Sequence, residues 1–292
     1  MKITELFKQG EFVISAEVGP PKGCHADELI EDAKKYLTNV HAINVTDNQS
    51  SVMRLGSLAV CKALKDAGFN PIFQMTCRDR NRLALQSDLL SAAMFGIDNV
   101  LALTGDHTFI GDHPQAKPVF DLDSASLLYT MCQLEQGKDL AGLDLVGEAP
   151  SFAKGAVVSP CSDSVDAQLV KMERKIAAGA EFFQTQAVFD SEQFIKFMEK
   201  AKQFGKPVQL GIIIPKSVGM CRFMNGNVAG VSIPESIFDE LKADKEKTKA
   251  GITGVEIAAR IIRECKPYCQ GVHVMTLGWE DKIPSLMEQA GL

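Results

Sequence analysis

The chain has 292 residues, 46% of them hydrophobic and 23% charged, which is enough to bury a substantial core within one α/β domain. Its formal net charge of −6 and isoelectric point near 5.5 argue against the basic surface with which proteins usually bind DNA or RNA, so we expect no nucleic-acid partner. Eight scattered cysteines without a CxxC pair indicate reduced thiols. Glu5 and Lys8 interrupt the start where a signal peptide needs an apolar run, and no segment reaches the ~18 apolar residues of a membrane span. These features predict a cytoplasmic protein without membrane insertion.

Short apolar, β-branched segments alternate with amphipathic helical segments along the chain, and this alternation predicts parallel βα units. Most of the expected strands are apolar on both faces, as a buried parallel sheet requires. The eight expected strands cover residues 12–17, 41–46, 71–76, 99–104, 155–159, 182–188, 208–214 and 271–277. Between them, a period of 3.6 residues predicts helices that include 28–36, 58–67, 84–95, 125–134, 167–178 and 257–262.

Three of these helices end on a glycine directly before the next strand, at Gly68, Gly96 and Gly179. The repeated junction predicts a (β/α)8 TIM barrel that forms a single domain over residues 1–292. Two segments rich in Gly, Pro, His and Asn, 107–121 and 215–233, are expected to be long loops after strands. In a barrel, such loops form the active-site face. The charged run 242–249 is expected to be a solvated helix end or loop.

Polar residues stand where the expected strands end, and in a barrel these ends converge on one mouth. Glu17 ends an apolar strand before a stiff Gly-Pro-Pro turn, which suits a general acid near the barrel axis. Asp106 follows Gly105, where a glycine allows the backbone to approach a ligand closely. Each residue alone has a plainer explanation as a loop residue or helix cap, but the set is harder to dismiss. Further members of the set are Thr46, Thr76, Thr104, Ser159, Gln186 and Thr276.

Five segments resemble the methylenetetrahydrofolate reductase family, specifically its bacterial-type catalytic barrel without a regulatory domain. In order, they are SAEVGPPK at 15–22, INVTDN at 43–48, LTGD at 103–106, ERKIAAGAEFFQTQAVFD at 173–190 and HVMTL at 273–277. The resemblance implies a flavin at the C-terminal face of the barrel, FAD by family pattern. It also implies hydride transfer from flavin N5 to 5,10-methylenetetrahydrofolate, which gives 5-methyltetrahydrofolate for one-carbon metabolism and methionine biosynthesis.

The resemblance also implies roles for individual residues. Glu17 matches the acid that protonates N10 as the five-membered ring opens, and Asp106 matches the carboxylate that contacts the pterin near the flavin. Gln186 matches a residue that hydrogen-bonds the folate, and Phe223 a loop aromatic that packs on it; Thr276 completes the expected substrate site. The expected flavin-binding residues are Thr46, Gln74, Thr76, Thr104, Gly105, Ser159, Arg174 and Lys175.

Several positions depart from the family pattern. Members commonly carry His, Arg, Tyr, His and Tyr where this chain has Gln74, Thr104, Gly155, Ser159 and Met275. Most of these positions belong to the flavin pocket, so FMN is an alternative to FAD. The missing aromatics also make two electron sources possible, NAD(P)H or a partner subunit in an oligomer or hetero-complex. No metal site is expected, because Pro267 interrupts the Cys265–Cys269 pair and no other His or Cys lies nearby in sequence.

Two other functions remain open at this point. A flavin-free methyltransferase or synthase barrel would also grip a pterin with an Asp and polar strand ends. A non-catalytic barrel could instead serve as a scaffold or relay subunit in an electron-transfer complex. The Glu17-x2-Pro-Pro segment and the Gln186-x2-Phe-Asp segment favour the reductase.

Overall fold

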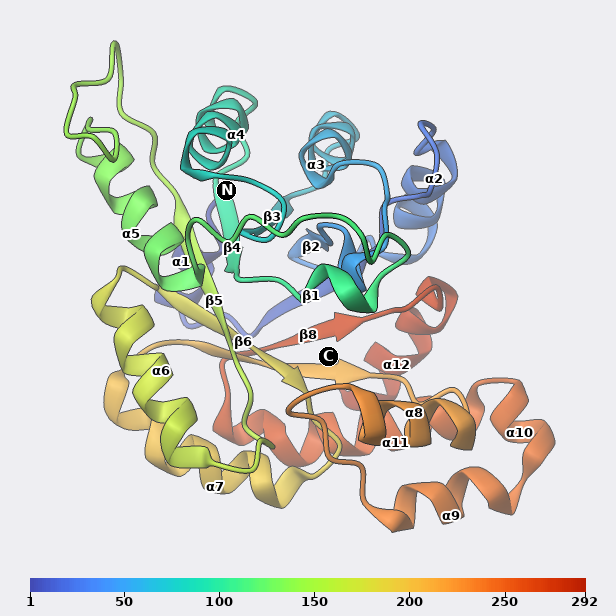
Figure 1. Ribbon diagram of the computed structural model, residues 1–292. Helices are drawn as coiled ribbons and strands as arrows, with labels where there is room; N and C mark the ends of the chain where they lie inside the picture. The colour runs from blue at the N-terminus through green and yellow to red at the C-terminus, as the bar shows by residue number, and fades with distance from the viewer.

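The computed structural model describes residues 1–292 as a closed barrel of eight parallel strands surrounded by helices (Figure 1). The strands follow one another around the barrel in chain order, and β8 pairs with β1 from Val13↔Gly271 to Glu17↔Met275. This confirms the predicted (β/α)8 fold. The strands are β1 Val13–Val18, β2 Ala42–Val45, β3 Pro71–Thr76, β4 Asn99–Leu103, β5 Ala153–Val158, β6 Phe182–Ala187, β7 Val208–Ile213 and β8 Gly271–Met275.

Several of the helices that follow a strand begin at a side-chain cap. Asn81, Asp123, Ser164 and Asp190 each accept a hydrogen bond from a backbone N–H of the first turn of α4, α5, α6 and α7. The helices are α1 Ile3–Lys8, α2 Asp27–Tyr36, α3 Ser57–Asp66, α4 Arg82–Met94, α5 Ser124–Glu135, α6 Val165–Ala177, α7 Ser191–Ala201, α8 Val218–Asn227, α9 Glu235–Ala243, α10 Lys245–Lys249, α11 Ile252–Cys265 and α12 Ile283–Ala290. Short 3-10 turns lie at η1 Gln49–Ser51, η2 Thr108–Ile110, η3 Lys202–Phe204, η4 Lys266–Tyr268 and η5 Glu280–Lys282.

The segment 215–233 is not the long loop that its composition suggested. Helix α8 occupies residues 218–227, capped by the Ser217 hydroxyl, which accepts from the Met220 N–H at 3.1 Å. Cys221 and Met224 are buried on one side of this helix. Together with α9 and α10 it forms an insertion between β7 and α11, drawn in orange in Figure 1. Tertiary packing and a cap therefore outweigh the helix-breaking composition.

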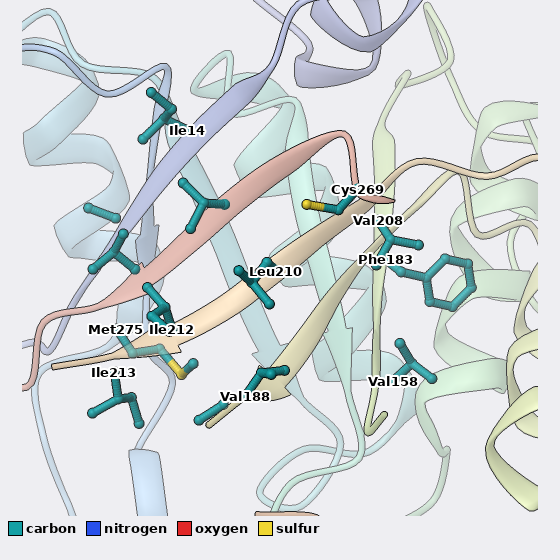
Figure 2. Packing of buried hydrophobic residues seen from close by; sticks show 14 of the residues in the cluster. Ile14, Val158, Phe183, Val188, Val208, Leu210, Ile212, Ile213, Cys269 and Met275 are labelled. Carbon is teal, nitrogen blue, oxygen red and sulfur yellow. The ribbon is translucent and has the colours of Figure 1, made fainter. Parts of the chain in front are cut away.

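Apolar side chains fill two separate layers of the barrel. A cluster of 65 buried residues joins the strands to the helices, with Ile14, Leu210 and Ile212 among its strand members (Figure 2). A cluster of eight, which includes Ile3 and Leu6 of α1 with Phe182 of β6, fills the N-terminal end of the barrel. Helix α1 therefore closes the end of the barrel opposite the expected active site. No helix of this structure is both long enough and apolar enough to cross a bilayer.

Candidate active site

A mainly polar cavity of about 330 Å³ opens at the C-terminal ends of the strands. It lies where barrel enzymes place their active sites, and its volume is within the usual range for a small-ligand pocket. Residues from seven strands or the loops that follow them line it. Eight of the residues expected from the sequence are among them: Glu17, Thr46, Gln74, Thr76, Thr104, Gly105, Asp106 and Gln186.

Glu17 is buried in the cavity wall, with only 7% of its surface exposed. Its Oε2 accepts a hydrogen bond from Gln74 Nε2 at 2.8 Å and lies 3.5 Å from His273 Nε2. Its Oε1 lies 3.5 Å from Gln49 Nε2. Side chains from β3, β8 and the loop after β2 thus surround the carboxyl group on three sides. A carboxyl held this way is well placed to exchange a proton with a bound ligand.

Asp106 lies at the exposed rim of the same cavity, directly after a left-handed glycine. Gly105 has φ +90°, and a Cβ on it would lie 3.1 Å from the Cβ of Thr76. The turn therefore requires glycine for both its backbone conformation and its space. Gln186 lines the cavity from the end of β6, half-buried. The Asp106 carboxylate can accept hydrogen bonds from donor groups on the edge of a ligand ring.

The predicted threonines differ in what their hydroxyl groups contact. Asp47 Oδ2 accepts from both the N–H and the hydroxyl of Thr76 at 2.9 Å, so this hydroxyl is already committed within the protein. Thr104 Oγ1 accepts from the Ser124 N–H at 3.1 Å. Thr46 Oγ1, in contrast, is buried without any hydrogen-bond partner and belongs to the cavity wall. Because an unpaired buried hydroxyl is costly, Thr46 offers a free polar contact to a ligand.

Arg78 joins the loops around the mouth, a role that the sequence analysis missed. Only 1% of the residue is exposed, and its guanidinium donates to the backbone carbonyls of Asn48 and Asp106 and to the Asp79 carboxylate. The neighbouring Arg80 holds Asp47 at 2.7 Å. The sequence signal that could have indicated this role is the alternation of charges in Cys-Arg-Asp-Arg, directly after the third strand.

The loops after β2 and β4 interlock above the cavity. A Cβ on Gly111 would lie 1.9 Å from the Ser51 carbonyl oxygen, so the two backbones touch. Asp112 accepts from Lys22 Nζ at 2.5 Å and from the Met53 N–H at 3.0 Å, and lies beside His113. The bonds from Lys22, His113 and Met53, in that order, hold the pKa of the Asp112 carboxyl well below its usual range.

Five expected site residues lie outside the cavity wall, and their roles stay predictions. Phe223 is on helix α8 rather than a loop, 62% exposed. Thr276 Oγ1 lies 2.8 Å from the Glu17 carbonyl oxygen and 2.7 Å from Glu280 Oε1, so its hydroxyl is engaged within the protein. Ser159 lines a separate cavity of about 950 Å³ near the start of α6. The remaining two are Arg174 and Lys175 on α6.

Arg174 and Lys175 have different surroundings although they are adjacent. Arg174 is exposed and forms a long ion pair with Asp123, 3.7 Å between Nη2 and Oδ2. Lys175 Nζ donates to the Val157 carbonyl at 2.6 Å. Burial, with a smaller contribution from Lys171, lowers the pKa of Lys175 to about 8. Only Arg174 could therefore reach a new anionic partner without giving up a buried contact.

A buried polar layer beneath Glu17 also went unnoticed in the sequence. Its side chains come from five strands, and in four of them they alternate with apolar residues; in β6, Gln184 is followed by Thr185. This alternation, read strand by strand, was the signal that could have revealed them. The members are Ser15, Asn44, Gln184, Gln209 and His273.

The fold and the cavity define a class of barrel enzyme that binds a small polar ligand. Its site holds a buried carboxyl group, Glu17, and an exposed carboxylate at the rim, Asp106. The family model described as "Methylenetetrahydrofolate reductase" matches residues 2–291, and the chain belongs to this family. The 5,10-methylenetetrahydrofolate reductases of Pectobacterium carotovorum and Escherichia coli K12 are each 26% identical over 265 residues, which cover 87% of this chain and 82% of theirs.

Two further comparisons extend over 98% or more of the chain. A probable methylenetetrahydrofolate reductase (NADH) of Oryza sativa is 26% identical over an alignment of 306 residues, which spans 100% of this chain and 50% of that protein. Among solved structures, an uncharacterized Clostridium thermocellum protein described as binding two copies of 5-methyl-5,6,7,8-tetrahydrofolic acid superposes with a TM-score of 0.66. It is 15% identical and covers 98% of this chain and 96% of its own, so the likeness supports the fold.

Proposed function

We propose that this chain reduces 5,10-methylenetetrahydrofolate to 5-methyltetrahydrofolate. The observation that carries the proposal is the buried Glu17 carboxyl in the wall of a cavity whose rim holds Asp106 and Gln186, in a member of this reductase family. Opening the imidazolidine ring of the substrate requires a proton on its N10 nitrogen. Two buried carboxyl groups line this cavity, Glu17 and Asp47. Asp47 is held by Thr76 and Arg80, so Glu17 is the one that can deliver a proton.

The other side chains of the cavity would bind and orient the folate. Asp106 presents an exposed carboxylate that can accept hydrogen bonds from the N–H groups of the pterin ring, and Gln186 can both donate and accept. Gln74 and Gln49 hold the two oxygens of Glu17 in place. Fixed donors and acceptors of this kind keep the reacting groups aligned and so lower the entropic part of the barrier.

The residues present fit a flavin. The unpartnered hydroxyl of Thr46 in the cavity wall is the contact that favours a bound polar group, and Gln74, Thr76, Thr104 and Gly105 share the same wall. When bound, a flavin would supply the hydride that the protein itself cannot provide. The exposed Arg174 is the basic group that could bind a flavin phosphate, because its ion pair with Asp123 is long and exposed. Since FAD and FMN both carry phosphate, both are compatible with the chain.

The test of the proposed function starts with the absorption spectrum of the purified chain. A yellow protein whose flavin bands bleach with reductant and return on addition of methylenetetrahydrofolate would support the reductase. Heat release and chromatography of the chromophore would then distinguish FAD from FMN. A colourless chain that binds folate but cannot be reconstituted with either flavin would instead indicate a flavin-free pterin barrel.

Electrons are proposed to arrive through a partner subunit, with NAD(P)H as the alternative donor. The proposal rests on Gly155 and Met275, which are not aromatic, at positions where the sequence pattern of the family has aromatics. The measurement is oxidation of NADH and NADPH by the flavin-loaded chain with a dye acceptor. Slow oxidation that a co-purified partner restores would support the partner, whereas rapid oxidation by the isolated chain would exclude it.

A further inference from the structure

The polar layer beneath Glu17 is oriented by the backbone. Gln209 Nε2 lies 3.1 Å from the Val13 carbonyl oxygen and 3.3 Å from that of Val272. Carbonyl oxygens only accept hydrogen bonds, so the NH₂ group of Gln209 has to face them. Its Oε1 then accepts from Gln184 Nε2 at 3.0 Å, and Gln184 Oε1 accepts from Asn44 Nδ2 at 2.8 Å. The orientation of each amide thereby determines the orientation of the next.

The orientation of these amides determines which hydrogen bonds the Ser15 hydroxyl accepts and which one it donates. Ser15 Oγ lies 3.3 Å from Gln184 Nε2 and 3.2 Å from Gln209 Nε2, and both of these nitrogens can only donate. Its third neighbour is His273 Nδ1 at 3.1 Å. The ring nitrogen is therefore the sole acceptor within reach of the hydroxyl hydrogen. Ser15 is 0% exposed, so bulk solvent does not reach this bond.

An imidazole Nδ1 that accepts a hydrogen bond leaves the proton of the neutral ring on Nε2. His273 Nε2 lies 3.5 Å from Glu17 Oε2, the oxygen that also accepts from Gln74. Catalytic hydrogen bonds are often this long before a ligand binds. The ring N–H adds a second donor beside Oε2, so the proton of a protonated Glu17 carboxyl is left to Oε1. The Gln49 amide, whose Nε2 lies 3.5 Å from Oε1, can turn over and accept that proton with its own oxygen.

We propose that His273 is a positioning residue for Glu17: locked by Ser15 as the Nε2–H tautomer, it holds Oε2 and so places the acidic proton on Oε1. The proton that reaches the substrate nitrogen comes from Oε1, and the carboxylate left behind is stabilised at Oε2. The mechanistic part of this inference rests on the proposed function. The tautomer itself depends only on the hydrogen-bond network.

The tautomer is tested by long-range ¹H–¹⁵N spectroscopy of the histidine side chains in the purified protein. The chain has five histidines, and the spectrum of His273→Gln identifies the signal that belongs to His273. For the neutral ring we expect a protonated Nε2 and an unprotonated Nδ1. Ser15→Ala should turn this signal into a mixture of tautomers. A wild-type signal from the Nδ1–H form would overturn the proposal.

The positioning role is tested with two amide variants. The terminal NH₂ of His273→Gln can reach the place of Nε2, whereas that of His273→Asn reaches only the place of Nδ1. We expect His273→Asn to lower the folate-dependent reoxidation of the flavin about 10- to 100-fold, and His273→Gln to restore most of it. Reduction of the flavin by dithionite should be unchanged in both. The exposed His25→Gln serves as the control.

Equal losses in the two amide variants would overturn the positioning role. If the wild-type chain itself does not turn over methylenetetrahydrofolate, the proposed function fails, while the spectroscopic result still decides the orientation of His273. If turnover is normal but the tautomer is Nδ1–H, the function stands and the inference about His273 fails.

Discussion

Glu17 is the residue on which the chemistry of the cavity depends, because its carboxyl group is buried and its two oxygens have different neighbours. Glu17→Gln keeps the shape and the hydrogen-bonding size of the side chain but removes the acidic proton. We expect flavin binding and flavin reduction to stay nearly intact while folate turnover falls by about 10²- to 10⁴-fold, the usual size of a general-acid contribution. Stopped-flow measurement of the two half-reactions checks this, and unchanged folate turnover would rule out Glu17 as the acid.

At the scale of secondary-structure elements, helix α1 owes its place to a small apolar cluster at the N-terminal end of the barrel. Phe182 is 0% exposed there, and its ring centroid lies 6.1 Å from that of Phe7. Phe182→Ala would leave a cavity between α1 and the strands, which we expect to lower the free energy of unfolding by about 3–5 kcal/mol. Chemical denaturation measures this. A loss below about 1 kcal/mol would mean that α1 does not pack as described.

The interlocked loops after β2 and β4 depend on the charge of Asp112. Its pKa is lowered in the folded protein, so its contribution to stability is present above the ordinary aspartate pKa of about 3.9 and is lost as the pH falls below it. Asp112→Asn should therefore lower the urea midpoint at pH 7 relative to wild type, and the difference should shrink toward pH 3. The exposed Glu148→Gln is the matched control. A difference that is constant with pH would exclude this ion cluster as the cause.

For the whole molecule, the sequence predicted the barrel and most of its mouth, because strand ends are marked by local signals. Asp106 after Gly105 and Glu17 before Gly-Pro-Pro could be recognised without any tertiary information. Helix α8 could not, since it depends on the Ser217 cap and on packing of Cys221 in the fold. The polar layer around Gln184 was missed for a similar reason: each strand contributes one member, and only the closed barrel brings the five side chains together.

The closure of the barrel by α1 has a consequence for the order in which reactants arrive and leave. Ile3 and Leu6 seal the far end, so the mouth is the entrance to the Glu17 cavity. If a soluble reductant such as NAD(P)H served the same cavity, it and the folate would have to occupy it in turn. Initial-rate plots at several fixed concentrations of one reactant would then give parallel lines, and each reactant in excess would inhibit the other. Intersecting lines would indicate that the electrons enter by a second route.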